Sequence, residues 1–216
     1  MRFWFRNGIQ TFLWSCVIGM AYILITVFSS GFGASVYDAL VAFPYYLLLG
    51  TAMFSVLMTS SAYALQLPVS LSMGRTRREA FFGLHTMTLT PVAFSLAACL
   101  LYCLLCRNDV AHDLLPLLPA AALGLIISTC VGHCMGCASI RFPRFGKVIS
   151  FIAVMIVCGG AGGIMGWIGS NGTVLNMASA SIGGILAFIL GGTVLILLAI
   201  VLPFQRGVLR RYEVKL

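Results

Sequence analysis

The chain has 216 residues, of which 61% are hydrophobic and only 8% are charged, and its mean hydropathy is +1.06. Because a soluble domain carries about 25% charged residues, this composition excludes a soluble enzyme, a secreted disulfide scaffold and a disordered tail. The formal net charge of +8 does not indicate a nucleic-acid partner, since the basic residues stand in four short clusters separated by long apolar runs.

Six apolar runs follow one another along the chain, each long enough to cross the roughly 30 Å hydrocarbon core of a bilayer as a helix. A transmembrane β-barrel would instead show alternating segments of about ten residues, which uninterrupted runs such as LILLAIVL do not allow. The sequence therefore predicts an all-α integral membrane protein with a single transmembrane domain over residues 1–216. The six predicted spans are residues 11–29, 39–65, 81–106, 114–136, 148–168 and 182–202.

A short aromatic segment precedes the first span. Phe3, Trp4 and Phe5 stand between Arg2 and Arg6. Aromatic side chains beside arginines suit the headgroup layer, so we expect residues 1–10 to lie along the membrane surface before the chain turns into the bilayer. A simple aromatic belt at the end of the first span explains the same residues equally well.

The cations predict the orientation of the spans, because translocating Lys and Arg is costly and cytoplasmic loops retain them. Only Arg107 falls on the outer side of the six-span arrangement, and the other twelve cations share the inner side. Both termini and the loops after the second and fourth spans should therefore be cytoplasmic. The twelve inner cations are Arg2, Arg6, Arg75, Arg77, Arg78, Arg141, Arg144, Lys147, Arg206, Arg210, Arg211 and Lys215.

The second and third spans carry stripes of hydroxyl side chains, which either hydrogen-bond neighbouring helices or line a transport route. The candidates for a pathway lining are Thr51, Ser55, Thr59, Thr86 and Thr90. His85 and His133 should lie toward the cytoplasmic leaflet. A hydrogen bond to a neighbouring helix explains each histidine better than a proton relay does.

The spans contain no group that would power transport or catalyse a reaction. No Asp, Glu, Lys or Arg stands well inside them, which disfavours ion-driven transport, and the chain has no GxxxxGK[ST] motif for nucleotide phosphates. Cysteines in residues 99–106 and 130–137 should lie about 20 Å apart in depth, and those in residues 130–137 are too spread along one helix to converge on one zinc ion. We therefore expect no enzyme activity, and no metal or cofactor bound by this chain. The late glycines suit tight helix packing, with a re-entrant segment over residues 169–180 as the functional alternative.

The most informative segment is the loop after the second span, LQLPVSLSMGRTRREAFFG, residues 65–83. Thr76 and Glu79 have the spacing of a capping box, in which each side chain bonds the other's backbone N–H, so a helix should begin there. Pro68 and Gly74 bracket a short piece before it. We therefore expect a helical turn, a break at glycine and then the cytoplasmic start of the third span, with arginines available to an acidic partner or to anionic lipid.

The string SMGRTRREAFFG, with six spans, cytoplasmic termini and an aromatic basic start, resembles the small permease subunits of ABC exporters of the second, exporter-type permease class. The resemblance covers the whole chain as architecture but only this string as a motif. It implies that residues 70–82 include the coupling helix, which receives movement from a separate ATPase, and that residues 1–10 are a membrane-surface connecting helix. A departure is the lack of a large outer domain between the fifth and sixth spans. The coupling residues are then Ser70, Leu71, Ser72, Met73, Gly74, Arg75, Thr76, Arg77, Arg78, Glu79 and Phe82.

By this resemblance the chain is a permease subunit in the cytoplasmic membrane of the cell. Its partners would be the lipid bilayer, a second six-span subunit, identical or homologous, and an ABC ATPase chain that binds ATP and Mg²⁺. The expected cargo is an amphipathic peptide, a lipid-like molecule or a drug. Two alternatives stay open: the substrate-capturing subunit of an energy-coupling-factor importer, and a non-transporting immunity or assembly protein. A neighbouring reading frame that encodes an ABC ATPase would favour the permease.

Overall fold

The computed structural model describes residues 2–29, 43–106, 109–142, 148 and 180–211. These residues form five α-helices and contain no strand: α1 (Arg2–Ser29), α3 (Phe43–Ser72), α4 (Arg77–Leu105), α5 (Asp109–Arg141) and α7 (Ala180–Arg211). Each helix contains a stretch long and apolar enough to cross a membrane: Arg2–Ile25, Phe43–Ser72, Arg77–Leu105, Leu117–Arg141 and Gly191–Val208. The predicted all-α fold is confirmed for the described residues, which supply the helices of a multi-pass membrane protein.

Five of the six predicted spans coincide with described helices, but each helix continues beyond its span at the end that carries arginines. For example, α3 ends at Ser72 rather than at residue 65, and α7 ends at Arg211 rather than at residue 202. The apolar runs stop where arginines and hydroxyls begin, whereas a helix continues into the headgroup layer because its backbone bonds are internal. Apart from Val148 and Ala180, the predicted fifth span, 148–168, and the segment 169–180 lie outside the described residues.

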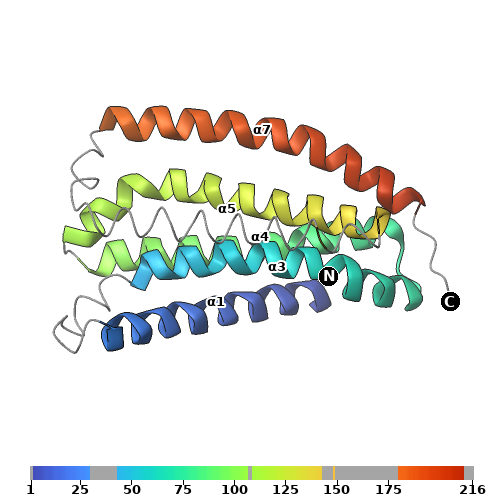
Figure 1. Cartoon of the computed structure of the whole chain (residues 1–216), viewed down its shortest axis with the longest axis horizontal. Coiled ribbons are helices and arrows are strands. Elements are labelled where there is room, and N and C mark those ends of the chain that lie inside the picture. Colours follow the sequence, from blue (N-terminus) through green and yellow to red (C-terminus); the bar gives the residue numbers. More distant parts are fainter. Residues whose placement is uncertain (1, 30–42, 107–108, 143–147, 149–179, 212–216) are drawn as a thin grey trace.

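Helices α1, α3, α4 and α5 alternate in direction, and α7 runs parallel to α5 (Figure 1). One end of the bundle therefore collects the start of α1, the end of α3, the start of α4 and the ends of α5 and α7. We call this the basic end, because the described arginines lie there. Helix α5 packs against α3, α4 and α7. Helix α7 packs mainly along α5, on the side away from α1, and its contact with α4 is slight (Figure 1).

In the middle of α1, hydroxyl side chains face inward and many large apolar side chains face outward. Thr11 and Ser15 are buried, and both donate hydrogen bonds to carbonyl oxygens one turn earlier in α1. This inside-out pattern is the one that a lipid environment favours, because lipid tails solvate apolar side chains but not hydroxyls. The exposed apolar side chains on α1 include Leu13, Trp14, Val17, Met20, Leu24, Ile25 and Phe28.

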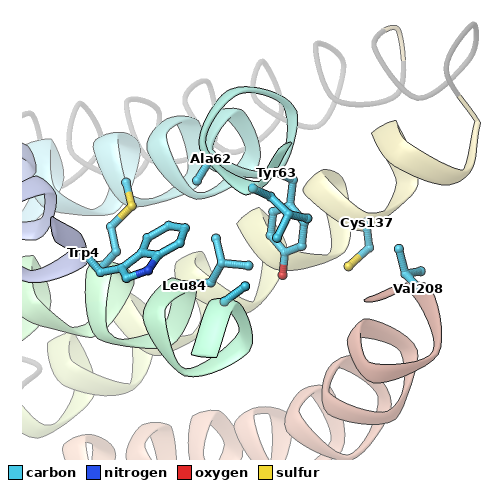
Figure 2. Close-up of a cluster of buried hydrophobic side chains, with 9 residues drawn as sticks. Trp4, Ala62, Tyr63, Leu84, Cys137 and Val208 are labelled. Carbon is cyan, nitrogen blue, oxygen red and sulfur yellow. The ribbon is translucent and has the colours of Figure 1, made fainter. Parts of the chain in front are cut away.

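The buried side chains form two main clusters. One fills the half of the bundle toward the basic end and draws on all five described helices (Figure 2). The other fills the far half, between α3, α4 and α5. The first cluster comprises Trp4, Ala62, Tyr63, Leu67, Ala80, Leu84, Met87, Cys137 and Val208, and the second comprises Leu47, Leu48, Val92, Cys99, Leu114, Leu118 and Leu125.

Two glycines allow the aromatic residues of the first cluster to fit. A Cβ on Gly83 of α4 would overlap the Trp4 indole, and a Cβ on Gly136 of α5 would overlap the Tyr63 ring. Each glycine therefore provides a slot into which a ring from a neighbouring helix lies directly against the backbone. These two slots fasten α1 to α4 and α3 to α5.

Candidate functional site

The connection between α3 and α4 is a four-residue turn, residues 73–76, capped on both sides. At the end of α3 the Gly74 N–H donates to the Leu71 carbonyl oxygen (3.1 Å) and the Arg75 N–H donates to the Ser70 carbonyl oxygen (3.3 Å). This pair of bonds is a Schellman motif, and it requires the left-handed conformation that Gly74 adopts at φ 78°. The turn is thus fixed to the last turn of α3.

The start of α4 is held by the predicted capping box, which the structure confirms. The Glu79 N–H donates to Thr76 Oγ1 (3.2 Å), and the Thr76 N–H donates to Glu79 Oε2 (3.3 Å). Two backbone N–H groups that have no acceptor within the helix therefore donate to side chains at this helix start. With caps on both sides, the turn is a stiff elbow between two long helices.

The structure differs from the sequence prediction in the form of this loop. Helix α3 runs through Pro68 to Ser72 without interruption, so the described residues contain no separate helical turn between Pro68 and Gly74. A proline does not break α3 here, and the only change of direction is at the elbow. The expected coupling helix over residues 70–82 is instead the last turn of α3, the elbow and the first turns of α4.

The predicted coupling residues differ in exposure. Ser70 is buried and donates to the Leu67 carbonyl oxygen (2.9 Å), and Leu71 is half-buried. Met73 is 73% exposed and Phe82 is 46% exposed. Arg75 is half-buried. The other predicted coupling residues are exposed, namely Ser72, Gly74, Thr76, Arg77, Arg78 and Glu79.

The N-terminal aromatic residues begin α1 instead of forming a separate surface segment. Residues 2–10 are the first turns of the same helix that continues to Ser29, and no turn separates them from the span. Trp4 is fully buried against Gly83, whereas Phe3 and Phe5 are exposed. The Arg75 guanidinium carbon lies 5.8 Å from the centre of the Phe3 ring, so the start of α1 contacts the elbow. The reason for the difference is the slot at Gly83, which holds Trp4 inside the bundle.

Three of the five candidate pathway residues form hydrogen bonds within or between the described helices. The Thr51 hydroxyl donates to the Leu47 carbonyl oxygen (2.7 Å) and therefore accepts from Ser95 (2.6 Å), which joins α3 to α4. Thr86 and Thr90 donate to carbonyl oxygens of their own helix, at Phe82 (2.9 Å) and Thr86 (2.6 Å). Ser55 and Thr59 are buried, and their hydroxyls have no hydrogen-bond partner in the described part of the chain.

A buried polar cluster joins three helices near the basic end. The Tyr63 hydroxyl of α3 lies 2.8 Å from Nδ1 of His133, and Thr88 Oγ1 of α4 lies 3.3 Å from Nε2 of the same histidine. Thr88 donates its hydrogen to the His85 carbonyl oxygen, so it accepts from Nε2–H of His133. Nδ1 then accepts from Tyr63. The prediction that His133 hydrogen-bonds neighbouring helices is confirmed.

The cluster continues through His85 toward α7. The His85 ring lies 4.7 Å from the His133 ring and 4.7 Å from the Phe81 ring, measured between centres. Gln205 of α7 is fully buried, and neither polar atom of its amide has a hydrogen-bond partner among the described residues; the same is true of Nε2 of His85. The interhelical hydrogen bonds of the cluster are those of His133, which hold α5 to α3 and α4.

The two histidines of this cluster were predicted from the sequence, whereas Tyr63 and Gln205 were not. Tyr63 has the i, i+4 spacing from Thr59 that places it on the inner stripe of α3, which is a signal that the sequence does contain. Gln205 stands between Pro203 and Arg206 beyond the last apolar run, so nothing in the sequence marks it as buried.

No family model, curated protein or solved structure matches this chain.

Proposed function

We propose that this chain is the membrane-spanning permease subunit of an ATP-binding-cassette exporter in the cytoplasmic membrane, and that its elbow docks onto a separate ATPase chain. The basic end would face the cytoplasm, because cations are retained on that side. The predicted span 148–168 would complete a set of six, and a second six-span subunit would complete the transport route.

The observation that carries the proposal is the elbow's exposed tip. Met73 is 73% exposed at the basic end, beyond the last helical residue of α3, and the cations of the α4 start follow it. A flexible apolar side chain beside arginines fits a partner surface with an apolar groove and an acidic rim. In this proposal the ATPase chain supplies that surface.

The contacts of the elbow also support a mechanical role. Its two caps fix it to α3 and α4, and the Arg75–Phe3 stacking joins it to α1. Trp4 in the slot at Gly83 ties the same end of α1 to α4. A displacement of the elbow would therefore move the ends of three helices together and shift the population between pathway conformations.

The cargo in this proposal is an amphipathic peptide, a lipid-like molecule or a drug. The buried polar side chains of the described helices are Ser, Thr, His and Gln, with no Asp, Glu, Lys or Arg among them. A route between such helices offers hydrogen bonds and apolar contacts but no fixed charge, which suits apolar and weakly polar cargo.

The test is site-specific photocrosslinking in cells that produce the full chain. A photoreactive amino acid at position 73 should crosslink to a nucleotide-binding ATPase, identified by mass spectrometry. Position 105 is the matched control, because Leu105 is also 73% exposed but lies at the far end of α4. Crosslinks from position 73 to lipid alone, or equal ATPase crosslinks from both positions, would refute docking at the elbow. A monomer that binds a small polar ligand without any ATPase would favour the importer subunit.

A further inference from the structure

Two arginines from different helices lie against one pair of aromatic rings at the basic end. The Arg78 guanidinium carbon of α4 is 5.9 Å from the centre of the Phe82 ring, and that of Arg206 of α7 is 5.5 Å from the centre of the Phe81 ring. The Phe81 and Phe82 rings meet edge to face, with centres 5.6 Å apart. The aromatic pair therefore links a cation of α4 to a cation of α7 where the two helices meet.

Neither cation is neutralised within the described part of the chain. Arg78 and Arg206 are both exposed, and neither forms an ion pair there. The carboxylate nearest to Arg78 in sequence, Glu79, is engaged with the Thr76 backbone in the capping box. Among the described residues, both positive charges thus lack an anionic partner.

Contact with the rings leaves the guanidinium N–H groups of both arginines available to bind an anion. A guanidinium that contacts a ring keeps its N–H donors directed outward around the ring's edge, in the planar fork that matches phosphate oxygens. Phe82 is 46% exposed, so an apolar surface adjoins the two cations. A cationic fork beside an exposed ring is suited to a ligand with a phosphate head and an apolar body.

The position in the fold indicates which ligand is available there. Arg78 lies in the first turn of α4, and Arg206 lies near the end of α7, so both are at the level where helices leave the apolar core. Phosphates of anionic phospholipids occupy that level and attract juxtamembrane arginines. We propose that Arg78 and Arg206, supported by Phe81 and Phe82, bind the headgroup phosphate of an anionic phospholipid. This proposal requires only that α4 and α7 cross a bilayer, and its test needs no ATPase.

The experiment is a lipid titration of the purified full-length chain in micelles of a zwitterionic lipid, with native mass spectrometry to count bound phosphatidylglycerol. The Arg78→Gln/Arg206→Gln variant should bind phosphatidylglycerol about tenfold to thirtyfold more weakly, since each juxtamembrane arginine contributes about 1 kcal/mol. The matched control is Arg2→Gln/Arg6→Gln, which removes two exposed charges from the same end without removing an arginine–ring contact. The control should retain most of the binding.

Three results would overturn the proposal. Equal losses in the two double variants would show that total charge governs binding, without a specific site. Equal affinity of the natural chain for phosphatidylcholine and phosphatidylglycerol would show no anionic selectivity. Full displacement by inorganic phosphate at millimolar concentration would assign the site to free phosphate. Circular dichroism monitors folding, and if the first variant does not fold, Phe82→Leu provides the test, because it keeps both charges and should still weaken phosphatidylglycerol binding severalfold.

Discussion

The slot at Gly136 provides a direct test of how α3 and α5 are held together. A methyl group at this position would approach three atoms of the Tyr63 ring within 3 Å, which is closer than unbonded carbon atoms tolerate. Tyr63 is fully buried, so its ring has no solvent to move into. In Gly136→Ala the two helices must separate or the ring must rotate away from His133.

The expected cost follows from three contributions. Overpacking a close-packed interior costs about 1–3 kcal/mol. Displacing the ring also weakens its 2.8 Å hydrogen bond to His133, which is worth about 0.6–1.7 kcal/mol inside a membrane. Replacing glycine by alanine in a helix returns about 1 kcal/mol. The net loss in the free energy of unfolding should be about 0.6–3.7 kcal/mol.

The assay is reversible unfolding of the purified chain by SDS in mixed micelles, followed by circular dichroism. Gly124→Ala on the same helix is the matched control, because a Cβ there meets nothing within 4 Å, and its stability should be unchanged or higher by up to about 1 kcal/mol. Adding Tyr63→Leu to Gly136→Ala should recover part of the loss by removing the ring. If Gly136→Ala is as stable as Gly124→Ala, the close packing described for α3 and α5 is wrong.

Three further predictions concern single hydrogen bonds. Tyr63→Phe should lower the free energy of unfolding by about 1 kcal/mol through loss of the bond to His133, and an unchanged midpoint in the same SDS assay would contradict the bond. Thr76→Ala should speed hydrogen exchange of the amides in the first turn of α4 and cost about 1 kcal/mol, whereas Thr76→Ser should not; equal exchange in both variants would exclude the cap. Thr51→Val and Ser95→Ala should be non-additive by about 0.6 kcal/mol in a double-mutant cycle, and additivity would show that their 2.6 Å contact contributes nothing.

Much of the fold follows from the sequence, because a bilayer leaves few options for an apolar run of this length. The five described spans, their order and the shared end of their arginines agree with the hydropathy and charge pattern. The helix ends do not follow from it. Helix α3 reaches Ser72 through Pro68, since proline removes one backbone bond but the packing of Leu67 and Ser70 on either side keeps the helix intact.

The local chemistry of the candidate site was predictable only where neighbours in sequence interact. The Thr76–Glu79 capping box is a contact across three residues, so spacing alone reveals it. The burial of Trp4 depends on the absence of a side chain at Gly83, on another helix, and aromatic residues beside arginines gave no sign of it. Gln205 illustrates the same limit, because its burial depends on how α7 packs against the bundle.

The slot that receives Trp4 has a consequence for how the protein is made. The indole belongs to the first turn of α1, but Gly83 is synthesised only after all of α3 and the first turns of α4. During that interval the nascent first span lacks its native neighbour at this end, and a membrane chaperone or the insertion machinery has an accessible tryptophan to bind. Assembly of this bundle should therefore finish at the basic end, with the indole entering its place only after α4 has been released from the translocon.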